Sequence, residues 1–201
     1  MKLAVALCLI ALALALTLEA RAATEVITFD DLPTPLPESP VPNGYGSLNW
    51  QGFDYVNASG NFLNTLNGLV SGTNVATDML YDPIIYAATT PTFNVNSVYV
   101  TTTLSEAPFN VEIVGYRSGT VIYDKTFAVN SSGPTLLSLN YLNVKSIQFI
   151  APFIGYPFFT PGRFVIDNLS VTVPEPALSA FAAFAALALA LIRSRPDHAP
   201  A

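Results

Sequence analysis

The side chains of this sequence that could do chemistry are mostly carboxylates. Between residues 24 and 172 there are eleven Asp and Glu against four Lys and Arg, a net charge of −7. The one histidine, His198, and the one cysteine, Cys8, lie outside that segment, which excludes a Ser-His-Asp triad, an imidazole base and a thiolate metal site from it. A carboxylate pair acting on glycosidic bonds stays open as an alternative. No spacing singles out such a pair, and we predict that the chain is not an enzyme.

Three carboxylates near the ends of this segment are candidate metal ligands: Asp30, Asp31 and Asp167. In extended strands Asp31 would share a face with Phe29, and Asp167 would share one with Leu169. A carboxylate on an apolar face costs free energy unless a cation or hydrogen bonds satisfy it, and calcium takes such oxygen ligands. The alternative is that Asp30 and Asp31 cap a turn and that Asp167 forms an Asx-type bend or pairs with a nearby arginine.

Aromatic side chains are the other candidate binding groups. Tyr156, Phe158 and Phe159 crowd a stretch broken by proline and glycine, residues 152–161, which we expect to be an exposed loop. Aromatic faces can stack against sugar rings while neighbouring amides bond to hydroxyl groups. We therefore predict polysaccharide as a ligand of this loop. Trp50 is instead expected in the core.

Short apolar runs separated by turn residues must position these side chains. Asn-Gly, Ser-Gly and Gly-Pro pairs separate the runs, and the five prolines of residues 33–42 exclude a helix there. Ser118-Gly119 is expected to form the turn of a hairpin. This pattern is typical of strands in a sandwich or barrel. The strands are expected at residues 47–56, 94–103, 110–116, 120–129, 136–141, 144–152 and 162–173.

The N-terminal residues, 1–23, have the pattern of a cleavable signal peptide. Lys2 supplies a positive charge, residues 3–18 are apolar apart from Thr17, and Ala20-Arg21-Ala22 has the small-x-small pattern of a cleavage site. Cleavage would remove the only cysteine. The mature domain would then depend on packing rather than on disulfides for its stability.

The C-terminal residues, 173–201, have a different pattern. Residues 177–192 are apolar except for Ser179, and Arg193 and Arg195 follow. As a helix these sixteen residues would span about 24 Å, slightly less than the hydrocarbon core of a bilayer. We predict a transmembrane helix with the arginines on the cytoplasmic side.

This tail resembles the PEP-CTERM sorting signal of bacterial proteins that exosortases process. The matching residues are Pro174, Glu175 and Pro176, then the apolar stretch, then Arg193 and Arg195. The resemblance implies an exosortase-type processing enzyme as a partner. A eukaryotic GPI-anchored wall protein is the alternative, which three Asn-x-Ser sequons favour, although GPI signals end in their hydrophobic tail.

The segment between the two ends has a second resemblance. Its opening (27–33), its Gly-Tyr-Gly-x-Leu-x-Trp-x-Gly-Phe stretch (44–53) and its close (164–169) look like secreted β-sandwich domains that are similar to the galactose-binding-like jelly rolls of carbohydrate-binding modules. The resemblance implies a jelly-roll-like sandwich with a structural calcium near the first and last strands. It implies a fold rather than an activity.

The sequence thus predicts an all-β, jelly-roll-like β-sandwich domain, residues 24–172, flanked by a signal-peptide helix and a transmembrane helix. We expect an exported, non-catalytic protein, anchored in the membrane or at the cell surface or held in an extracellular polysaccharide matrix. A carbohydrate-binding module and a secreted carboxylate-dependent glycoside-active enzyme are the alternatives. Nucleic acid is excluded as a partner, because binding to phosphates needs clustered Lys and Arg.

Overall fold

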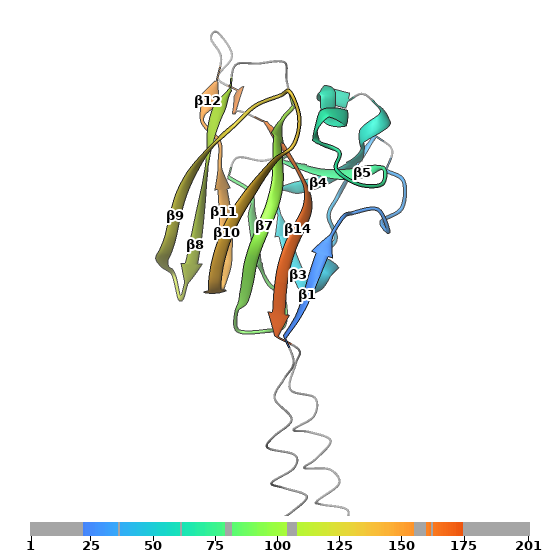
Figure 1. Cartoon of the computed structure of the whole chain (residues 1–201). Coiled ribbons are helices and arrows are strands. Elements are labelled where there is room, and N and C mark those ends of the chain that lie inside the picture. Colours follow the sequence, from blue (N-terminus) through green and yellow to red (C-terminus); the bar gives the residue numbers. More distant parts are fainter. Residues whose placement is uncertain are drawn as a thin grey trace, which may run out of the picture. The chain divides into compact units, whose positions relative to one another are not determined.

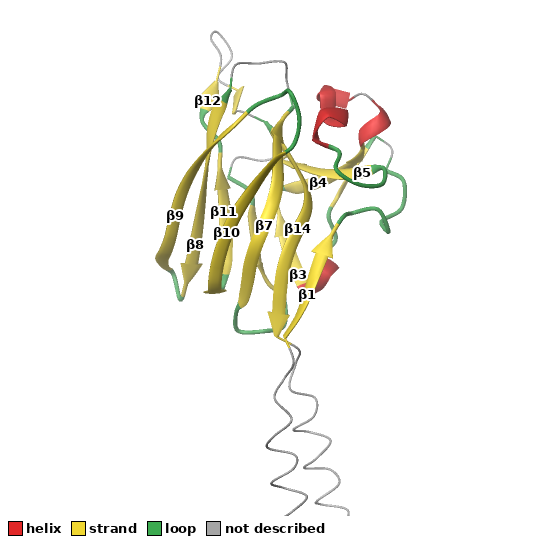
Figure 2. Cartoon of the chain, in the orientation of Figure 1, coloured by secondary structure: helices red, strands yellow, loops and turns green. Residues whose placement is uncertain are grey.

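The computed structural model describes residues 22–174 except 36, 61, 79–81, 104–107, 155–159 and 162. Within this range Thr24–Val173 forms one compact unit, which consists of β-sheets and short 3-10 turns (Figures 1 and 2). Most of the predicted signal peptide and of the predicted tail lies outside the described residues. No helix among the described residues is long and apolar enough to cross a membrane.

Two large antiparallel sheets make up most of the domain, and a third sheet has two short strands. The larger has the order β10 (Thr135–Val144), β7 (Phe93–Thr102), β14 (Phe164–Pro174), β5 (Asn74–Asp78), β4 (Phe53–Asn57) and β2 (Glu38–Pro40), and β1 (Ala22–Ile27) also pairs with β14. The smaller has the order β3 (Leu48–Gln51), β6 (Ile84–Ala87), β11 (Ser146–Ile150), β8 (Phe109–Arg117) and β9 (Thr120–Val129). The remaining elements are β12 (Phe153–Ile154) with β13 (Thr160–Pro161), and the 3-10 turns η1 (Tyr45–Ser47), η2 (Ala58–Gly60) and η3 (Phe62–Gly68).

Aromatic rings from both sheets meet in the core. Phe53 of β4 and Phe164 of β14 contact Phe149 of β11, each with a centroid distance of 5.6 Å. Trp50, expected in the core, is 5% exposed, and its indole N–H donates to the Tyr45 carbonyl at 3.0 Å. The sheets therefore pack face to face, and the prediction of an all-β sandwich is confirmed.

The hairpin predicted at Ser118-Gly119 is confirmed. It joins β8 to β9, and both turn residues have positive φ, 49° and 78°, as a type I′ turn requires. The proline-rich segment forms an extended connection that contributes β2, which pairs with β4 at the border of its sheet.

Two expectations about side-chain faces are wrong. The register of β14 shifts between Asp167 and Ser170, where Asn168 has φ of 48°. Because this bulge reverses the alternation, Asp167 lies on the outer face with Val165, while Leu169 joins the core. Phe29 has φ of 65° beyond the end of β1, so Asp31 does not continue the strand's alternation.

One lysine bridges the free borders of the two sheets. β9 ends the five-stranded sheet and β10 ends the other. Lys125 of β9 donates from Nζ to the Leu139 carbonyl of β10 at 2.9 Å, and its ammonium lies 5.3 Å from the centroid of Tyr141. Tyr123 stacks on the same ring at 4.4 Å. The contacts between these two strands therefore combine a charge with aromatic packing.

Candidate functional site

The outer face of the five-stranded sheet presents an aromatic and polar surface, which we name the platform. Its residues alternate along each strand with side chains of the core such as Trp50, Ile85, Ile113 and Ile147. Gln51 and Asp124 of the platform are exposed, and its other residues are half-buried. The platform comprises Asn49, Gln51, Ile84, Tyr86, Glu112, Tyr116, Asp124, Ser146 and Gln148.

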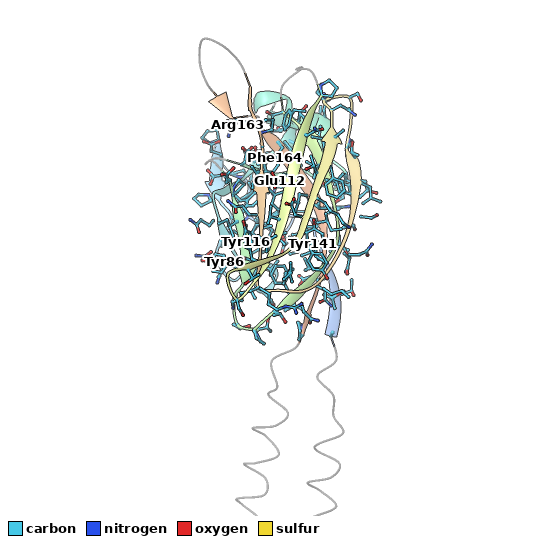
Figure 3. The ribbon with its side chains drawn as sticks, turned by 90° about the vertical axis from the view of Figure 1, so that its left-hand side faces the viewer. Tyr86, Glu112, Tyr116, Tyr141, Arg163 and Phe164 are labelled. Carbon is cyan, nitrogen blue, oxygen red and sulfur yellow. The ribbon has the colours of Figure 1, made fainter. Side chains whose placement is uncertain are left out.

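The strand register places two tyrosines in one row of the platform. Ser146 of β11 pairs with Tyr86 of β6 on one side and with Tyr116 of β8 on the other. The two tyrosines are therefore two strand spacings apart, roughly 10 Å between backbones. Asn49 of β3 continues the row beyond Tyr86. Figure 3 shows Tyr86 and Tyr116 toward the same end of the sheet, with Glu112 further along.

A second row gives the platform a defined hydrogen-bonding polarity. Gln51, Ile84 and Gln148 pair across β3, β6 and β11. The Tyr116 hydroxyl donates to Gln148 Oε1 at 2.9 Å. Because that oxygen is engaged, the Gln148 amide group can offer its N–H donors to a ligand, while the Tyr116 oxygen can accept.

Carboxylates mark the other end of the platform. Glu112 lies on β8, and Asp124 lies diagonally across from it on β9. Partial burial, followed by the negative charge and hydrogen bonding of Asp124 and the charge of Asp82, raises the pKa of Glu112. Three negative charges therefore lie within interaction distance of one another on this side of the sheet.

The positive charges of the described residues are directed to backbone carbonyls. Arg117 donates to Leu142 and Asn143, Lys125 to Leu139, Lys145 to Thr90, and Arg163 to Asp78. Arg117 and Lys145 follow or precede platform residues in the chain, at the tyrosine end. These hydrogen bonds therefore go to main-chain acceptors and not to Glu112, Asp124 or Asp82.

The outer face of the seven-stranded sheet is covered around β4, β5 and β14. Here Val56, Val75 and Val165 form a second apolar cluster with Ala58 of η2, and Leu69 packs against it. Residues 69–74 continue this cover, and two carboxylates bind their backbone. We name Asp30, Asp167 and residues 69–74 the loop clamp.

Asp167 binds the first part of the loop clamp. Its Oδ2 accepts from the Val70 and Ser71 N–H groups at 2.7 and 3.0 Å, and its Oδ1 accepts from the Asn168 N–H at 2.7 Å. The residue is 0% exposed. Burial raises its pKa to about 6, the three N–H donors oppose that shift, and the Asp30 charge adds to it.

Asp30 binds the second part of the loop at residues 69–74. Its Oδ1 accepts from the Thr73 and Asn74 N–H groups at 2.6 and 3.0 Å. The Asn74 side chain, 2% exposed, donates to the Phe29 and Leu32 carbonyls, while its Oδ1 has no hydrogen-bond partner. The loop is thus bound at both ends by acids that are 137 positions apart in the chain.

The predicted calcium ligands separate into a pair and a single residue. Asp30 and Asp167 meet at the loop clamp, but Asp31 is exposed and accepts from the Tyr45 hydroxyl at 2.5 Å. Within the described residues, no three His, Cys, Asp or Glu side chains gather as a metal site. The backbone N–H donors already engage the carboxylates of the pair, so this arrangement does not fit a calcium ion as it stands, and calcium stays a prediction.

Other predicted site residues lie outside the described range. These are Tyr156, Phe158 and Phe159 of the aromatic loop, and Glu175, Pro176, Arg193 and Arg195 of the tail. Pro174 is described as the last residue of β14. The ligand-binding and sorting roles of these residues stay predictions.

A further buried carboxylate has a structural role. Asp78 is 3% exposed, and its Oδ1 accepts from the Phe164 N–H at 2.8 Å. Burial raises its pKa to about 7, against the opposing effects of that hydrogen bond and of the Arg163 charge. The carboxylate binds the first residue of β14 and does not face the platform rows.

Sequence reasoning missed the platform. Tyr86 and Tyr116 are 30 positions apart, and only the pairing of both with Ser146 brings them into one row. The available signal was the alternation of Ile84 and Tyr86 around Ile85, which indicates an outward-facing tyrosine on a half-buried strand.

No known family model matches this sequence, and no curated protein matches it. A solved structure similar to it is the CBM22-1 xylan-binding domain of Xyn10C from Paenibacillus barcinonensis, at 12% identity and a TM-score of 0.44, covering 78% of this chain and 99% of that one. Another is CBM29_1, a family 29 carbohydrate binding module from Piromyces equi, at 11% identity and a TM-score of 0.39, covering 75% of this chain and 89% of that one. The ligand of this chain has to be inferred from its own residues.

Proposed function

We propose that the chain is an exported, non-catalytic β-sandwich protein that binds polysaccharide through the platform. The observation that carries this proposal is the row in which Tyr86 and Tyr116 flank Ser146. The proposal moves the predicted ligand from the loop of Tyr156 and Phe158 to a sheet surface.

The chemistry of the row suits a sugar chain. A tyrosine ring offers an apolar face to the C–H groups of a pyranose, and its hydroxyl bonds to a sugar hydroxyl. Two such rings roughly 10 Å apart on a sheet can contact separate sugar units of one extended chain. Gln148, Gln51 and Asn49 add amide donors and acceptors between and beside them.

The carboxylates of the platform favour binding over hydrolysis. Glycosidase pairs flank the scissile bond with their carboxyl groups about 5–10 Å apart. Glu112 and Asp124 instead lie diagonally opposite each other on neighbouring strands, close enough for Asp124 to raise the pKa of Glu112. We therefore assign them to the surface that surrounds the ligand and propose no catalytic role.

Isothermal titration of the purified full chain against soluble polysaccharides tests the proposal. Tyr86→Ala and Tyr116→Ala should each weaken binding by about tenfold, the equivalent of roughly 1.4 kcal/mol. Tyr99→Ala is the matched control, because Tyr99 is a half-buried tyrosine of β7 in the other sheet. Blank titrations and glycan arrays for the wild-type chain, or equal losses for all three variants, would refute the platform as the binding surface.

Export and sorting form a separate part of the proposal. Support comes from the signal-peptide pattern of residues 1–23 and from Pro174-Glu175-Pro176 followed by an apolar stretch and arginines. We propose that an exosortase-type enzyme cuts near this tripeptide and leaves the domain at the cell surface or in the extracellular matrix. Mass spectrometry of the mature C-terminus should find an end near Pro174–Pro176. A mature chain that extends to Ala201 would contradict the cleavage.

A further inference from the structure

We infer that the platform selects uncharged polysaccharide chains and excludes those that carry carboxylate or sulfate groups. This inference rests on the proposed function and adds a substrate class to it. It follows from the charges around the tyrosine row rather than from the row itself.

The first step is the location of negative charge beside the binding row. Asp124 ends the row that contains Gln51, Ile84 and Gln148, because it pairs with Val114, which pairs with Gln148. Glu112 lies in the next row on β8, and its interactions with Asp124 and Asp82 are repulsive. A sugar chain that extends from the tyrosines across the sheet therefore comes close to these carboxylates.

The second step is the orientation of the nearest cations. Arg117 follows Tyr116 in the chain, but its Nε and Nη2 donate to the Asn143 and Leu142 carbonyls at 2.6 and 3.0 Å. Lys145 precedes Ser146, and its Nζ donates to the Thr90 carbonyl at 3.3 Å. These bonds direct both cations to backbone carbonyls rather than to the side chains of the platform. An anionic sugar would therefore meet the carboxylates without a cation placed to receive it.

The third step is the size of the repulsion. Like charges a few ångströms apart repel one another more strongly near a protein surface than in bulk water, because the effective dielectric constant is lower there. The net charge of −7 between residues 24 and 172 has the same sign as the local field. We expect this repulsion to weaken the binding of an anionic polysaccharide by about tenfold. The effect should become smaller as added salt shortens the Debye length below about 10 Å.

A matched pair of ligands isolates the charge. One is a soluble neutral polysaccharide that binds the full chain, and the other is the same polysaccharide with part of its primary hydroxyl groups oxidised to carboxylates. At low salt the oxidised form should bind about tenfold more weakly. The difference in affinity between the neutral and the oxidised polysaccharide should become smaller at about 0.5 M salt. Equal affinities at low salt, or tighter binding of the oxidised form, would overturn the inference and leave the proposed function intact.

A matched pair of variants locates the effect. The double variant Glu112→Gln/Asp124→Asn removes two acidic groups from the platform. Its affinities for the neutral and the oxidised polysaccharide should become nearly equal, so that their ratio approaches one. Glu25→Gln/Asp31→Asn removes two charges from exposed residues on and after β1, in the other sheet, and should leave the ratio unchanged. If both doubles shift the ratio equally, overall charge and not the platform sets the selectivity. If the wild-type chain binds neither polymer, the proposed function itself fails.

Discussion

The two outer faces of the sandwich differ in what their carboxylates bind. In the loop clamp, Asp30 and Asp167 accept five hydrogen bonds from backbone N–H groups and hold residues 69–74 over the sheet. On the platform, Glu112 and Asp124 lie diagonally opposite each other on neighbouring strands, and the charge of Asp124 raises the pKa of Glu112. The comparison teaches that a carboxylate under a loop stabilises the fold, whereas a carboxylate on an open sheet face is available to act on a ligand.

The largest difference between the faces should come from removing one acid on each. Asp167→Ala leaves three part-buried N–H groups without their acceptor, so we expect the free energy of unfolding to fall by about 3 kcal/mol. Asp124→Ala, on the platform, should change it by less than about 0.5 kcal/mol. Urea denaturation of both variants measures this, and equal losses would contradict the assignment of separate roles.

The buried acids of the seven-stranded sheet should also make stability depend on pH. Because burial raises the folded-state pKa of Asp78 to about 7 and of Asp167 to about 6, from 3.8, the folded chain retains protons that the unfolded chain releases. The free energy of unfolding should therefore fall as pH rises from about 4 to about 7, by about 3 kcal/mol for Asp78.

Asp78→Asn tests this assignment, because the amide oxygen can still accept from the Phe164 N–H while no charge is buried. Denaturant titrations at several pH values should give a shallower pH dependence for this variant than for the wild-type chain. An unchanged slope would mean that Asp78 does not titrate in this range.

Two glycines with positive φ sharpen the comparison further. Gly72 has φ of 57°, and a Cβ there would overlap the Asp30 carboxylate. Gly119 of the β8–β9 turn has φ of 78°, and its Cβ would meet nothing within 4 Å. Gly72→Ala should lower the free energy of unfolding by about 2 kcal/mol and Gly119→Ala by about 1 kcal/mol. The second effect is smaller because an alanine at Gly119 would be strained only by its left-handed backbone conformation and would not overlap a neighbour. Thermal denaturation should rank them in that order, and the reverse order would show that residues 69–74 are not held against Asp30.

The smallest expected effect is that of calcium. If calcium binds as the sequence predicts for Asp30, Asp31 and Asp167, adding it to the full chain should raise the free energy of unfolding by about 1 kcal/mol, and Asp30→Asn should abolish the effect. Differential scanning calorimetry with calcium and with EDTA measures this. A melting temperature insensitive to both would leave the N–H and hydroxyl donors of the chain as the partners of these carboxylates.

Local features of the fold were predictable because they depend on neighbouring residues. The Ser118-Gly119 turn and the burial of Trp50 each follow from turn chemistry or apolar pattern over a few positions. The bulge at Asn168 was not predictable, because one extra residue in β14 depends on its pairing with β7. The faces of Asp167 and Leu169 were therefore assigned wrongly.

The candidate site was harder to predict for the same physical reason. Asp30 and Asp167 were recognised as unusual, but their partners at residues 70–74 lie about 40 and 97 positions away. The platform depends on the register of β6, β11 and β8, which no local pattern specifies. Long-range pairing, rather than residue type, determines which side chains of this domain meet.

Lys125 affects how the border of the five-stranded sheet can associate with a second copy of the chain. A strand at the border of a sheet exposes unpaired N–H and C=O groups and can recruit a second copy into fibrous aggregates. Lys125 of β9 points inward, binds the Leu139 carbonyl and lies over the ring of Tyr141. It would lose these partners if another strand paired with the border there. The segment of residues 24–172 contains no cysteine to lock its borders. In such a domain one inward-pointing ammonium group, bound to a carbonyl of the neighbouring sheet, serves as a safeguard against self-association.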